Sequence, residues 1–567
     1  MRYAVDPLQK LLFDPSELMF SPMTLKFLRG DWPGLFRAQV LHLMPAEALG
    51  TSFHQTLGSP TKELYGMAGA IFLKDFFDLT IEQAVERYLL DAGWQYALNI
   101  NPIEASMSHA TIERYIKLFK KNQLAGEVFH RVTSAFIEAL ELDISRQRLD
   151  STHIFSDMAV FGRTKLMGVT IKRFLTQLKR QHRKFYDDLP EELRTRYLPS
   201  QGKLFADDRS GRKQLRQTVA EDLLLLASRF AEEADIIRRT SYKALQRVLE
   251  EQCDVVEEQV VLKEKTTGKV MQNPSDPEAS YDGHKGPGYQ AQIAETCGEG
   301  NEVQLITSAM VEPAHACDQE ALVPTLDELD DHDRLPDLLY TDTSYGRDEN
   351  VVAAAQRGVD LQSPVSGPSP GNADDLSLDD FVIDEKAEVV VSCPNGCKPR
   401  RSEHNQSKGK TRTVMNSSDC STCAFLGQCP VQQVGGDFVL CHTPKQRRIA
   451  ERRAEQGTEV FRENYAVRAG GESVNSGLKR KLGLARVRVR GAPAVSMAVL
   501  LRCAGWNLLR ALQTLKKHGI RDFTSYFAVL GRRPGVLASR GKPDNVVLSY
   551  PQLFWRHPGD IPPSLAA

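Results

Sequence analysis

Two aspartates lie in segments whose other residues favour β-strands. Asp150 lies within the β-branched stretch 148–155, and Asp342 closes the short apolar stretch 338–342. Aspartate is depleted in strands, so its presence there calls for an explanation. Open α/β sheets carry their chemistry on acids that end a strand just before a turn. We therefore expect this chain to fold around a sheet that carries both acids.

The order of segments around the two aspartates indicates a mixed α/β fold. Strand-like and helical patterns alternate after the first aspartate, as strand, hairpin, strand, helix and strand. The strand-like stretches are 148–155, 289–294, 303–307, 338–342 and 359–361, and the helical ones are 318–329 and 349–357. A strongly apolar helix, 495–514, is expected to pack on the resulting sheet.

Four polar residues near the C-terminus fall on one side of a single helix drawn through them: Tyr465, Arg468, Glu472 and Lys479. At 3.6 residues per turn they lie within about 60° of each other. A phenol, a guanidinium, a carboxylate and an ammonium make a poor core. They make a good surface for a metal ion and a phosphodiester.

Glu472 on this stripe would be a third carboxylate beside Asp150 and Asp342. Three converging carboxylates suit Mg²⁺, a hard ion that prefers oxygen ligands. A pair of such ions stabilises both the attacking and the leaving oxygen of a phosphoryl displacement. Arg468 and Lys479 are placed for the phosphate oxygens, and Tyr465 can donate a hydrogen bond or stack on a base.

The spacing Tyr465-x2-Arg468-x3-Glu472-x6-Lys479 resembles the Tyr-Arg-Glu-Lys signature of the DDE transposases of bacterial insertion sequences. Other segments agree with this family in order. They are 149–153 around the first aspartate, 276–279 with 288–292 in the next hairpin, 341–346 around the second aspartate, and 475–480 with 488–491 after the glutamate.

The resemblance implies an RNase H-like core in which Asp150, Asp342 and Glu472 hold Mg²⁺ or Mn²⁺. It implies hydrolysis at the ends of a transposon, followed by attack of the freed 3′-OH on target DNA. The expected partner is double-stranded DNA, as terminal inverted repeats and as target, bound by a homodimer. In one departure from the family pattern, Gly470 and Gly471 precede Glu472, where an apolar residue is expected. Each costs about 1 kcal/mol against alanine in a helix, so the stripe is either kinked or begins at Glu472.

Six of the ten cysteines crowd between Cys393 and Cys441. In a chain without a secretory signal, such crowding indicates a metal site before disulfides. The pair Cys420-x2-Cys423 can share a tetrahedral zinc, with Cys393 and Cys429 as the completing ligands. Alternative ligands are Cys397, Cys441 and His442, and more remotely His404. A cluster that is merely reduced is the competing interpretation.

Hydropathy argues against a membrane protein, whereas the net charge does not identify a partner. Net charge is −1, but eight Lys and Arg without an acid lie between Arg163 and Lys184, which suits local contact with phosphates. No apolar run approaches the ~20 residues that span a bilayer, and the start lacks the apolar stretch of a secretory signal. We expect a cytoplasmic protein without membrane contact, and the resemblance implies a bacterial one associated with the nucleoid.

These patterns divide the chain into five parts. Residues 1–143 form a helical, DNA-binding domain, and 144–390 form the first part of the core, with a helical insertion at about 160–260. A zinc-type insertion follows at 391–443, then the last part of the core at 444–515 with the catalytic glutamate, and an irregular tail at 516–567.

Two other functions remain open on the sequence alone. One is a metal-dependent DNA nuclease with the same core and no strand transfer. The other is a DNA-binding protein whose catalytic core has decayed.

Overall fold

A mixed sheet forms the centre of the computed structural model, which describes residues 1–9, 14–198, 212–257, 259–365, 375–384 and 386–530. The long strands β1 (Arg146–Ile154), β5 (Gly286–Thr296) and β6 (Ile306–Pro313) pair antiparallel. On the other side of β1, β7 (Leu338–Tyr340) and β8 (Asp360–Gln362) pair parallel. The resulting order β6-β5-β1-β7-β8, with β4 (Ser280–Asp282) on the start of β5, fits the RNase H-like core expected from the sequence.

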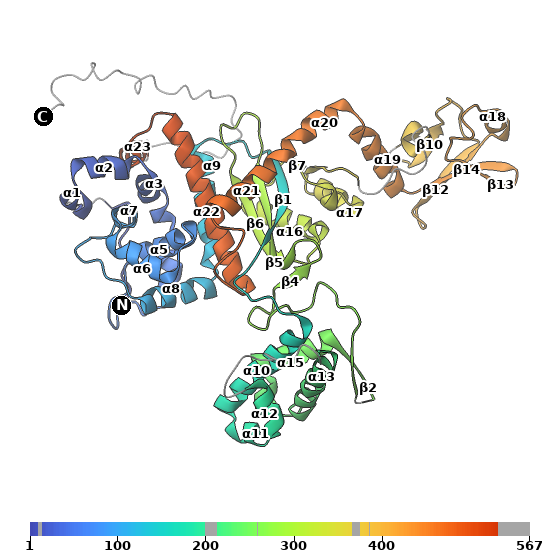
Figure 1. Cartoon of the computed structure of the whole chain (residues 1–567). Coiled ribbons are helices and arrows are strands. Elements are labelled where there is room, and N and C mark those ends of the chain that lie inside the picture. The colour runs from blue at the N-terminus through green and yellow to red at the C-terminus, as the bar shows by residue number, and fades with distance from the viewer. Residues whose placement is uncertain (10–13, 199–211, 258, 366–374, 385, 531–567) are drawn as a thin grey trace, which may run out of the picture.

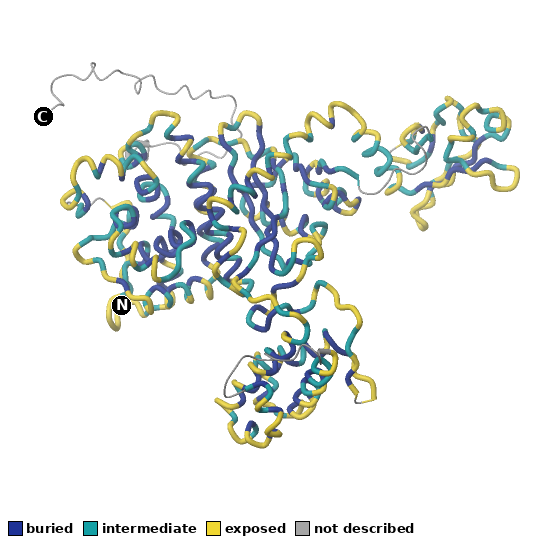
Figure 2. The backbone as a smooth tube through the Cα atoms, in the orientation of Figure 1, coloured by how far each residue is buried: buried dark blue, intermediate teal, exposed yellow. Residues whose placement is uncertain are grey.

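Helices cover both faces of this sheet (Figure 1). On one face, α16 (Asp318–Asp331) and α17 (Asp348–Gln356) pack on a cluster that contains Leu149 and Leu339. On the other, α22 (Ala492–Lys517) packs on β6, where the buried side chain of Asn507 bonds the N–H and the C=O of Ile306. Because both faces are covered, β5 is buried from Gly288 to Thr296, whereas β4 and β8 are partly exposed (Figure 2).

The N-terminal helices share one hydrophobic core with α22 and the sheet. Phe72 and Phe129 from these helices belong to the same buried cluster as Ile293 and Leu501. The helices are α1 (Pro15–Met19), α2 (Pro22–Arg29), α3 (Trp32–Gln39), α4 (Ala46–Gly50), α5 (Leu64–Phe76), α6 (Ile81–Leu90), α7 (Ala92–Ala97), α8 (His109–Lys121) and α9 (Leu124–Ala139). Residues 1–143 thus contain the expected helices. These helices share their hydrophobic core with α22 and the sheet.

A helical lobe is inserted in the sequence between β1 and β4, and it projects from the body (Figure 1). It has a hydrophobic core of its own, which includes Phe174, Leu223 and Tyr242. Its elements are α10 (Arg163–Gln181), α11 (Arg183–Asp187), α12 (Glu191–Tyr197), α13 (Arg212–Arg229), α14 (Ala234–Ile237), α15 (Thr240–Gln252), and a hairpin of β2 (Cys253–Val256) and β3 (Gln259–Leu262).

A second insertion, after β8, forms an arm that projects away from the body on the side opposite the N-terminal helices (Figure 1). It comprises β9 (Val382–Asp384), β10 (Val389–Ser392), β11 (Arg401–Asn405), β12 (Lys410–Met415), α18 (Ser417–Ser421), β13 (Gln432–Val434) and β14 (Asp437–His442). Helices α19 (Pro444–Gln456) and α20 (Glu459–Tyr465) return the chain to α21 (Gly470–Lys481) against the sheet.

The C-terminal region is helical further than expected. Helix α22 ends at Lys517, and α23 (Phe523–Leu530) lies within the segment 516–567 for which an irregular tail was expected. Residues 531–567 of that segment lie outside the described residues. Among the described helices, α22 alone is long and apolar enough to cross a bilayer, but 72% of its apolar window is buried inside the protein. The buried Arg502 on this helix bonds Asp78 and the carbonyl of Gly483, as suits a core helix.

One buried carboxylate ties the lobe to the body. Asp276 is 0% exposed and accepts hydrogen bonds from Ser156 Oγ at 2.6 Å, from the Tyr289 hydroxyl, and from the Gly491 N–H at 3.0 Å. These three donors lie after β1, at the start of β5 and before α22. Asp276 therefore fixes three chain segments where the lobe leaves the sheet.

Asp276→Ala should lower the free energy of unfolding by about 3 kcal/mol or more, because three donors lose a buried acceptor. Denaturant unfolding would measure the change. Glu264→Ala removes an exposed carboxylate near the lobe and should change the stability by less than about 0.5 kcal/mol. Equal stability of the two variants would contradict this role of Asp276.

Candidate active site

The parallel pairing of β1 with β7 brings the two aspartates together. Arg148 lies opposite Tyr340 in this register, so Asp150 and Asp342, each two residues further on, reach the same level of the sheet. Asp150 is still inside β1, whereas Asp342 has left β7. Its carboxylate accepts the Ser344 N–H at 2.8 Å and caps the 3-10 turn Thr343–Tyr345.

Arg468 lies between the two carboxylates. Its Nη2 is 3.4 Å from Asp150 Oδ1 and 4.0 Å from Asp342 Oδ2. Asp150 also accepts hydrogen bonds from Asn475 Nδ2 at 3.1 Å and from the Ser151 N–H at 3.0 Å. Burial raises the pKa of Asp150, the Arg468 charge opposes this, and the Asp342 carboxylate adds to it. The site is thus a pair of close acids balanced by one cation.

Lys479 lies near the same pair. It is half-buried, and its pKa is lowered by burial and by the charge of Lys285, while Asp150 opposes the shift. Lys285 is exposed in the turn before β5. Lys479, close to Asp150 and to Lys285, supplies positive charge of the kind that a phosphate group requires.

Tyr465 is engaged by the protein itself. Its hydroxyl donates to the Thr341 carbonyl at 2.8 Å, and its ring stacks on Phe461 at 5.4 Å between centroids. Burial raises its pKa. The tyrosine therefore holds the residue before Asp342 in place.

The single straight helix assumed for Tyr465, Arg468, Glu472 and Lys479 is wrong. Helix α20 ends at Tyr465, a 3-10 turn spans Ala466–Ala469, and α21 begins at Gly470. The sequence allowed two alternatives to the straight helix, a kinked stripe or a helix that begins at Glu472. In the structure, α21 begins at Gly470, two residues before Glu472 and directly after the 3-10 turn.

Of the two glycines, Gly470 is the one that lets α21 approach β1 closely. A Cβ on Gly470 would collide with the guanidinium of Arg148, which is held by the buried Glu295 and by the Val467 carbonyl at 2.9 Å. A Cβ on Gly471 would lie 3.6 Å from Asp150 Cβ, an ordinary contact. Glycine at 470 therefore allows the helix to rest on the strand that carries Asp150.

Glu472 does not join the acid pair in this structure. It is exposed on the first turn of α21. Over the described residues, no three His, Cys, Asp or Glu side chains lie together in an arrangement able to hold a metal ion. The structure thus brings together Asp150, Asp342, Arg468 and Lys479 of the expected site and leaves Glu472 at its edge.

Sequence reasoning missed Asp318 and Asn475. Asp318, the first residue of α16, accepts from Ser151 Oγ at 3.3 Å and from Gln292 Nε2 at 3.0 Å, and its charge raises the pKa of Asp150. An acid in the first turn of a helix is an ordinary helix-start signal, so nothing in the sequence distinguishes Asp318. Asn475 lies one turn beyond Gly471; the family resemblance covered it within 475–480 but gave it no role, and its contact with Asp150 follows from the closeness of α21 to β1.

The arginines of α19 are also used internally. Arg452 is half-buried and donates to the Gly346 carbonyl at 3.0 Å and to the Ser363 carbonyl at 2.9 Å. Ser363 Oγ in turn donates to the Asp342 carbonyl at 2.6 Å. Arg448 pairs with the buried Asp348 at 2.7 Å. These contacts hold the loop around Asp342, so this basic cluster is not a free phosphate surface.

The acid pair has donors that fit Mg²⁺ or Mn²⁺. Mg²⁺ is held in proteins by one or two carboxylates and keeps several waters or phosphate oxygens. Asp150 and Asp342 supply two carboxylates at one level of the sheet, and the raised pKa of Asp150 is the penalty that a bound cation would relieve.

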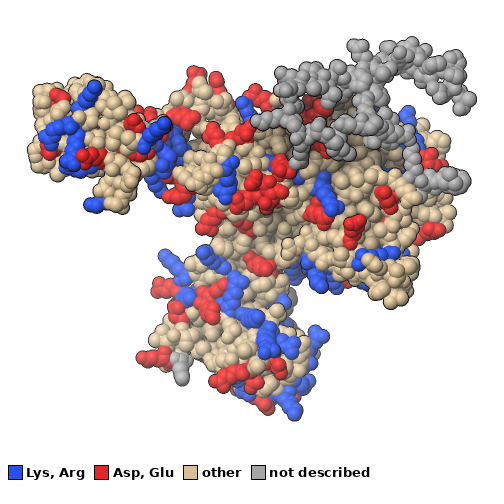
Figure 3. Space-filling model, turned by 180° about the vertical axis from the view of Figure 1, so that it is seen from behind, with Lys and Arg blue, Asp and Glu red and all other residues tan. Residues whose placement is uncertain are grey.

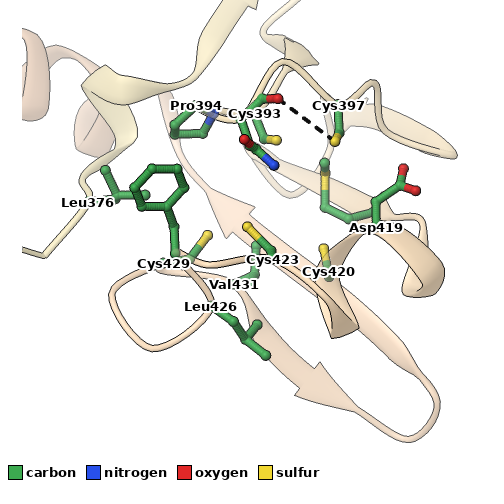
Figure 4. Close-up of a pocket in the computed structure, with 13 residues that line it drawn as sticks. Leu376, Cys393, Pro394, Cys397, Asp419, Cys420, Cys423, Leu426, Cys429 and Val431 are labelled. Atoms are coloured by element: carbon green, nitrogen blue, oxygen red, sulfur yellow. Dashed lines mark hydrogen bonds between the residues drawn. The ribbon is translucent and has the colours of Figure 1, made fainter.

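Five cysteines line a cavity of about 20 Å³ in the arm: Cys393, Cys397, Cys420, Cys423 and Cys429. Their sulfur atoms face one another across it (Figure 4). Burial and the neighbouring thiols raise the pKa of Cys420 to about 11. Cys441 is exposed on β14 and, like His442, does not line the cavity. The four expected ligands thus line the same cavity as Cys397, although among the described residues no three of these thiols are arranged to hold a metal ion.

A family model described as a transposase DDE domain matches residues 392–512. The matched segment contains the cysteine arm, Tyr465, Arg468, Glu472 and Lys479, and most of α22; Asp150 and Asp342 lie before it. This match supports a DDE transposase, a DNA-cleaving enzyme. A search of curated proteins and a search of solved structures each returned no match.

Gly470→Ala should destabilise the protein by about 3 kcal/mol, because the new Cβ displaces Arg148 and leaves the buried Glu295 without its partner. Gly471→Ala is the matched control and should leave the stability unchanged or raise it by up to about 1 kcal/mol. Thermal unfolding of both variants would measure the difference. If the two alanines behave alike, close approach of α21 to β1 is not the reason for the glycines.

Proposed function

We propose that the protein is a DDE transposase that cleaves transposon ends by metal-dependent phosphodiester hydrolysis and joins the 3′-OH to target DNA. The observation that carries this proposal is the pair Asp150 and Asp342, set at one level of the sheet with Arg468 between them. Its partners would be terminal inverted repeats and target DNA. The N-terminal helices would contribute to DNA binding, and two copies would act together on paired ends.

In this mechanism Asp150 and Asp342 would hold the divalent ion, with Glu472 as the third carboxylate. When bound, the ion would supply charge neutralisation for displacement at the phosphodiester. Arg468 and Lys479 bind the non-bridging phosphate oxygens. Tyr465 keeps the Asp342 loop in place through the Thr341 carbonyl. Glu472 reaches the acid pair only if its exposed side chain turns inward, so DNA binding would complete the site.

Asp150→Ala and Asp342→Ala should each lower Mg²⁺-dependent cleavage of a transposon end about 100-fold or more and leave end binding intact. Gel assays of cleavage and of binding would measure both effects. Asp254→Ala, in the exposed hairpin of the lobe, is the control and should cleave normally. Normal cleavage by Asp150→Ala would refute the site, and a protein that binds ends but never cuts would favour a decayed core.

A strand-transfer assay with pre-cleaved ends separates the transposase from a nuclease built on the same core. The transposase should join the 3′-OH to target DNA in Mg²⁺ or Mn²⁺. Cleavage without any joining, in either ion, would favour the nuclease.

We also propose that the arm holds a structural zinc ion at Cys393, Cys420, Cys423 and Cys429. Thiolates are preferred zinc ligands, and metal binding deprotonates thiols whose pKa is raised. The arm has few buried apolar residues, among them Phe381, Val390 and Leu440, so a metal would stabilise it. As a DNA-acting enzyme of a bacterial cell, the protein would be cytoplasmic and associated with the nucleoid.

Cys420→Ser and Cys423→Ser should lose zinc from the purified protein, whereas Cys441→Ser should retain it, because its side chain is exposed outside the cavity. Metal analysis by mass spectrometry would measure the content. Zinc that is absent from the wild type, or equal in all variants, would contradict this site. Cys397→Ser tests whether the fifth thiol takes part.

A further inference from the structure

We propose that the helical lobe is a second grip on duplex DNA, and that the DNA backbone follows a row of cations from Lys479 to α10. This inference rests on the proposed function, because it assigns a partner surface to the same site. The row joins three parts of the chain that are distant in the sequence: 479–490, the turn at Lys285, and α10. Each step is carried by contacts or packing between neighbouring segments.

The row begins at the acid pair. The charge of Lys285 lowers the pKa of Lys479, and Lys479 is also close to Asp150. Both lysines lie near His153, close to the end of β1. Gly286, the residue after Lys285, lies against the ring of Phe155. The exposed Arg486 guanidinium stacks over the same ring at 5.7 Å. The cations at 285 and 486 therefore flank one aromatic side chain at the end of β1.

The segment after α21 continues the row. Here Arg486, Arg488 and Arg490 are exposed, while Val487 is buried and Val489 is partly buried. The segment runs along the chain that leaves β1: the Phe155 N–H donates to the Ala485 carbonyl at 3.0 Å, and the Asp157 N–H to the Val489 carbonyl at 2.9 Å. Along this path Arg486 lies over Phe155, Arg488 pairs with Asp78 at 3.2 Å, and Arg490 pairs with Asp157 at 2.8 Å.

The row then passes onto the lobe at Arg173. Burial lowers the pKa of Arg173, and the nearby charge of Arg490 lowers it further. Arg173 also donates to Ser275 Oγ, next to the buried Asp276 that bonds the Gly491 N–H. The neck of the lobe therefore holds Arg490 and Arg173 side by side, although Arg490 also pairs with Asp157 at 2.8 Å.

Helix α10 presents the rest of the row. Its exposed cations share an arc of about 120° at 100° per residue. They are Lys165, Lys172, Arg173, Lys179 and Arg180. Within the described residues, Lys172, Lys179 and Arg180 have no ion pair, and α10 itself carries no acid. The 19 residues of α10 span about 28 Å, the length of about eight base pairs.

A DNA backbone is the occupant that this surface fits. The row is cationic and has no apolar patch among its exposed members, so it offers contacts to phosphates without base readout. The face seen in Figure 3 shows exposed Lys and Arg side chains on the lobe and near its junction with the body, with acidic side chains between them. The hydrophobic core of the lobe makes α10 a firm surface.

Binding of a fluorescein-labelled 40-base-pair duplex of arbitrary sequence to the full-length protein tests the inference, by anisotropy over a range of NaCl. The variant Lys172→Ala/Lys179→Ala/Arg180→Ala should weaken binding tenfold or more. It should lower the slope of log K against log salt by about 2 to 3, because each phosphate contact contributes about 0.9. The single Lys172→Glu variant should change binding in the same direction.

The matched control is Lys213→Ala/Arg238→Ala/Lys243→Ala, which removes three exposed cations from other helices of the lobe. It should bind nearly as the wild type does. Equal weakening by both triple variants, or wild-type binding by the α10 variant, would overturn the inference. If those results accompany cleavage that still requires Asp150, the proposed function survives and only the second grip is lost. A wild type that binds no duplex would overturn both.

Discussion

Asp150 and Asp342 share one level of the sheet because β1 and β7 pair in parallel with Arg148 opposite Tyr340. A shift of this register by one residue would separate the two carboxylates and turn every side chain of β7 to the other face. The register is held by burial, since Leu149 and Leu339 belong to the core between the sheet and α16. The close acids, the cation between them and the chemistry proposed for them all depend on this pairing.

Two buried polar networks support the acid pair from opposite faces. On the α16 face, Gln292 donates to Asp318 and Glu312 and accepts from Tyr345, and Asp318 holds Ser151 beside Asp150. On the α21 face, Arg148 joins the buried Glu295 to the carbonyl that precedes Arg468. Such networks are rigid when every member is satisfied, because an unpaired polar group is costly in a low dielectric. They fix the acids, while Glu472 is left at the exposed rim.

Positive charge serves two different purposes in this protein. The arginines of α19, together with Tyr465 at the end of α20, hold the Asp342 loop through backbone carbonyls and Asp348, so they support the architecture. The cations of the 486–490 segment and the exposed cations of α10 lie at the surface, although Arg488 pairs with Asp78 and Arg490 with Asp157. A sequence count of basic residues treats the two groups alike. Burial and hydrogen bonding separate them, because a guanidinium that bonds several internal acceptors is not available to a phosphate.

The sequence by itself determined the nature of the main elements and the identity of the two aspartates. Alternating and buried-type patterns predicted β1, β5, β7 and β8, and the periodicity of the apolar residues predicted α16, α17 and α22. These predictions succeed because backbone preference and side-chain spacing are local properties. The five crowded cysteines that line one cavity were likewise visible as a cluster, since short spacings keep them near each other in any fold.

Only the tertiary structure decided how these parts act together. It broke the assumed helix before Gly470, so that α21 could rest on β1. It brought Asn475 and Asp318 to Asp150, engaged the Tyr465 hydroxyl with the Thr341 carbonyl, and left Glu472 exposed. It also set Arg490 beside Arg173 across more than 300 positions of sequence. The sequence does not predict such contacts between distant residues. They depend on strand register and on how closely a helix can approach a sheet.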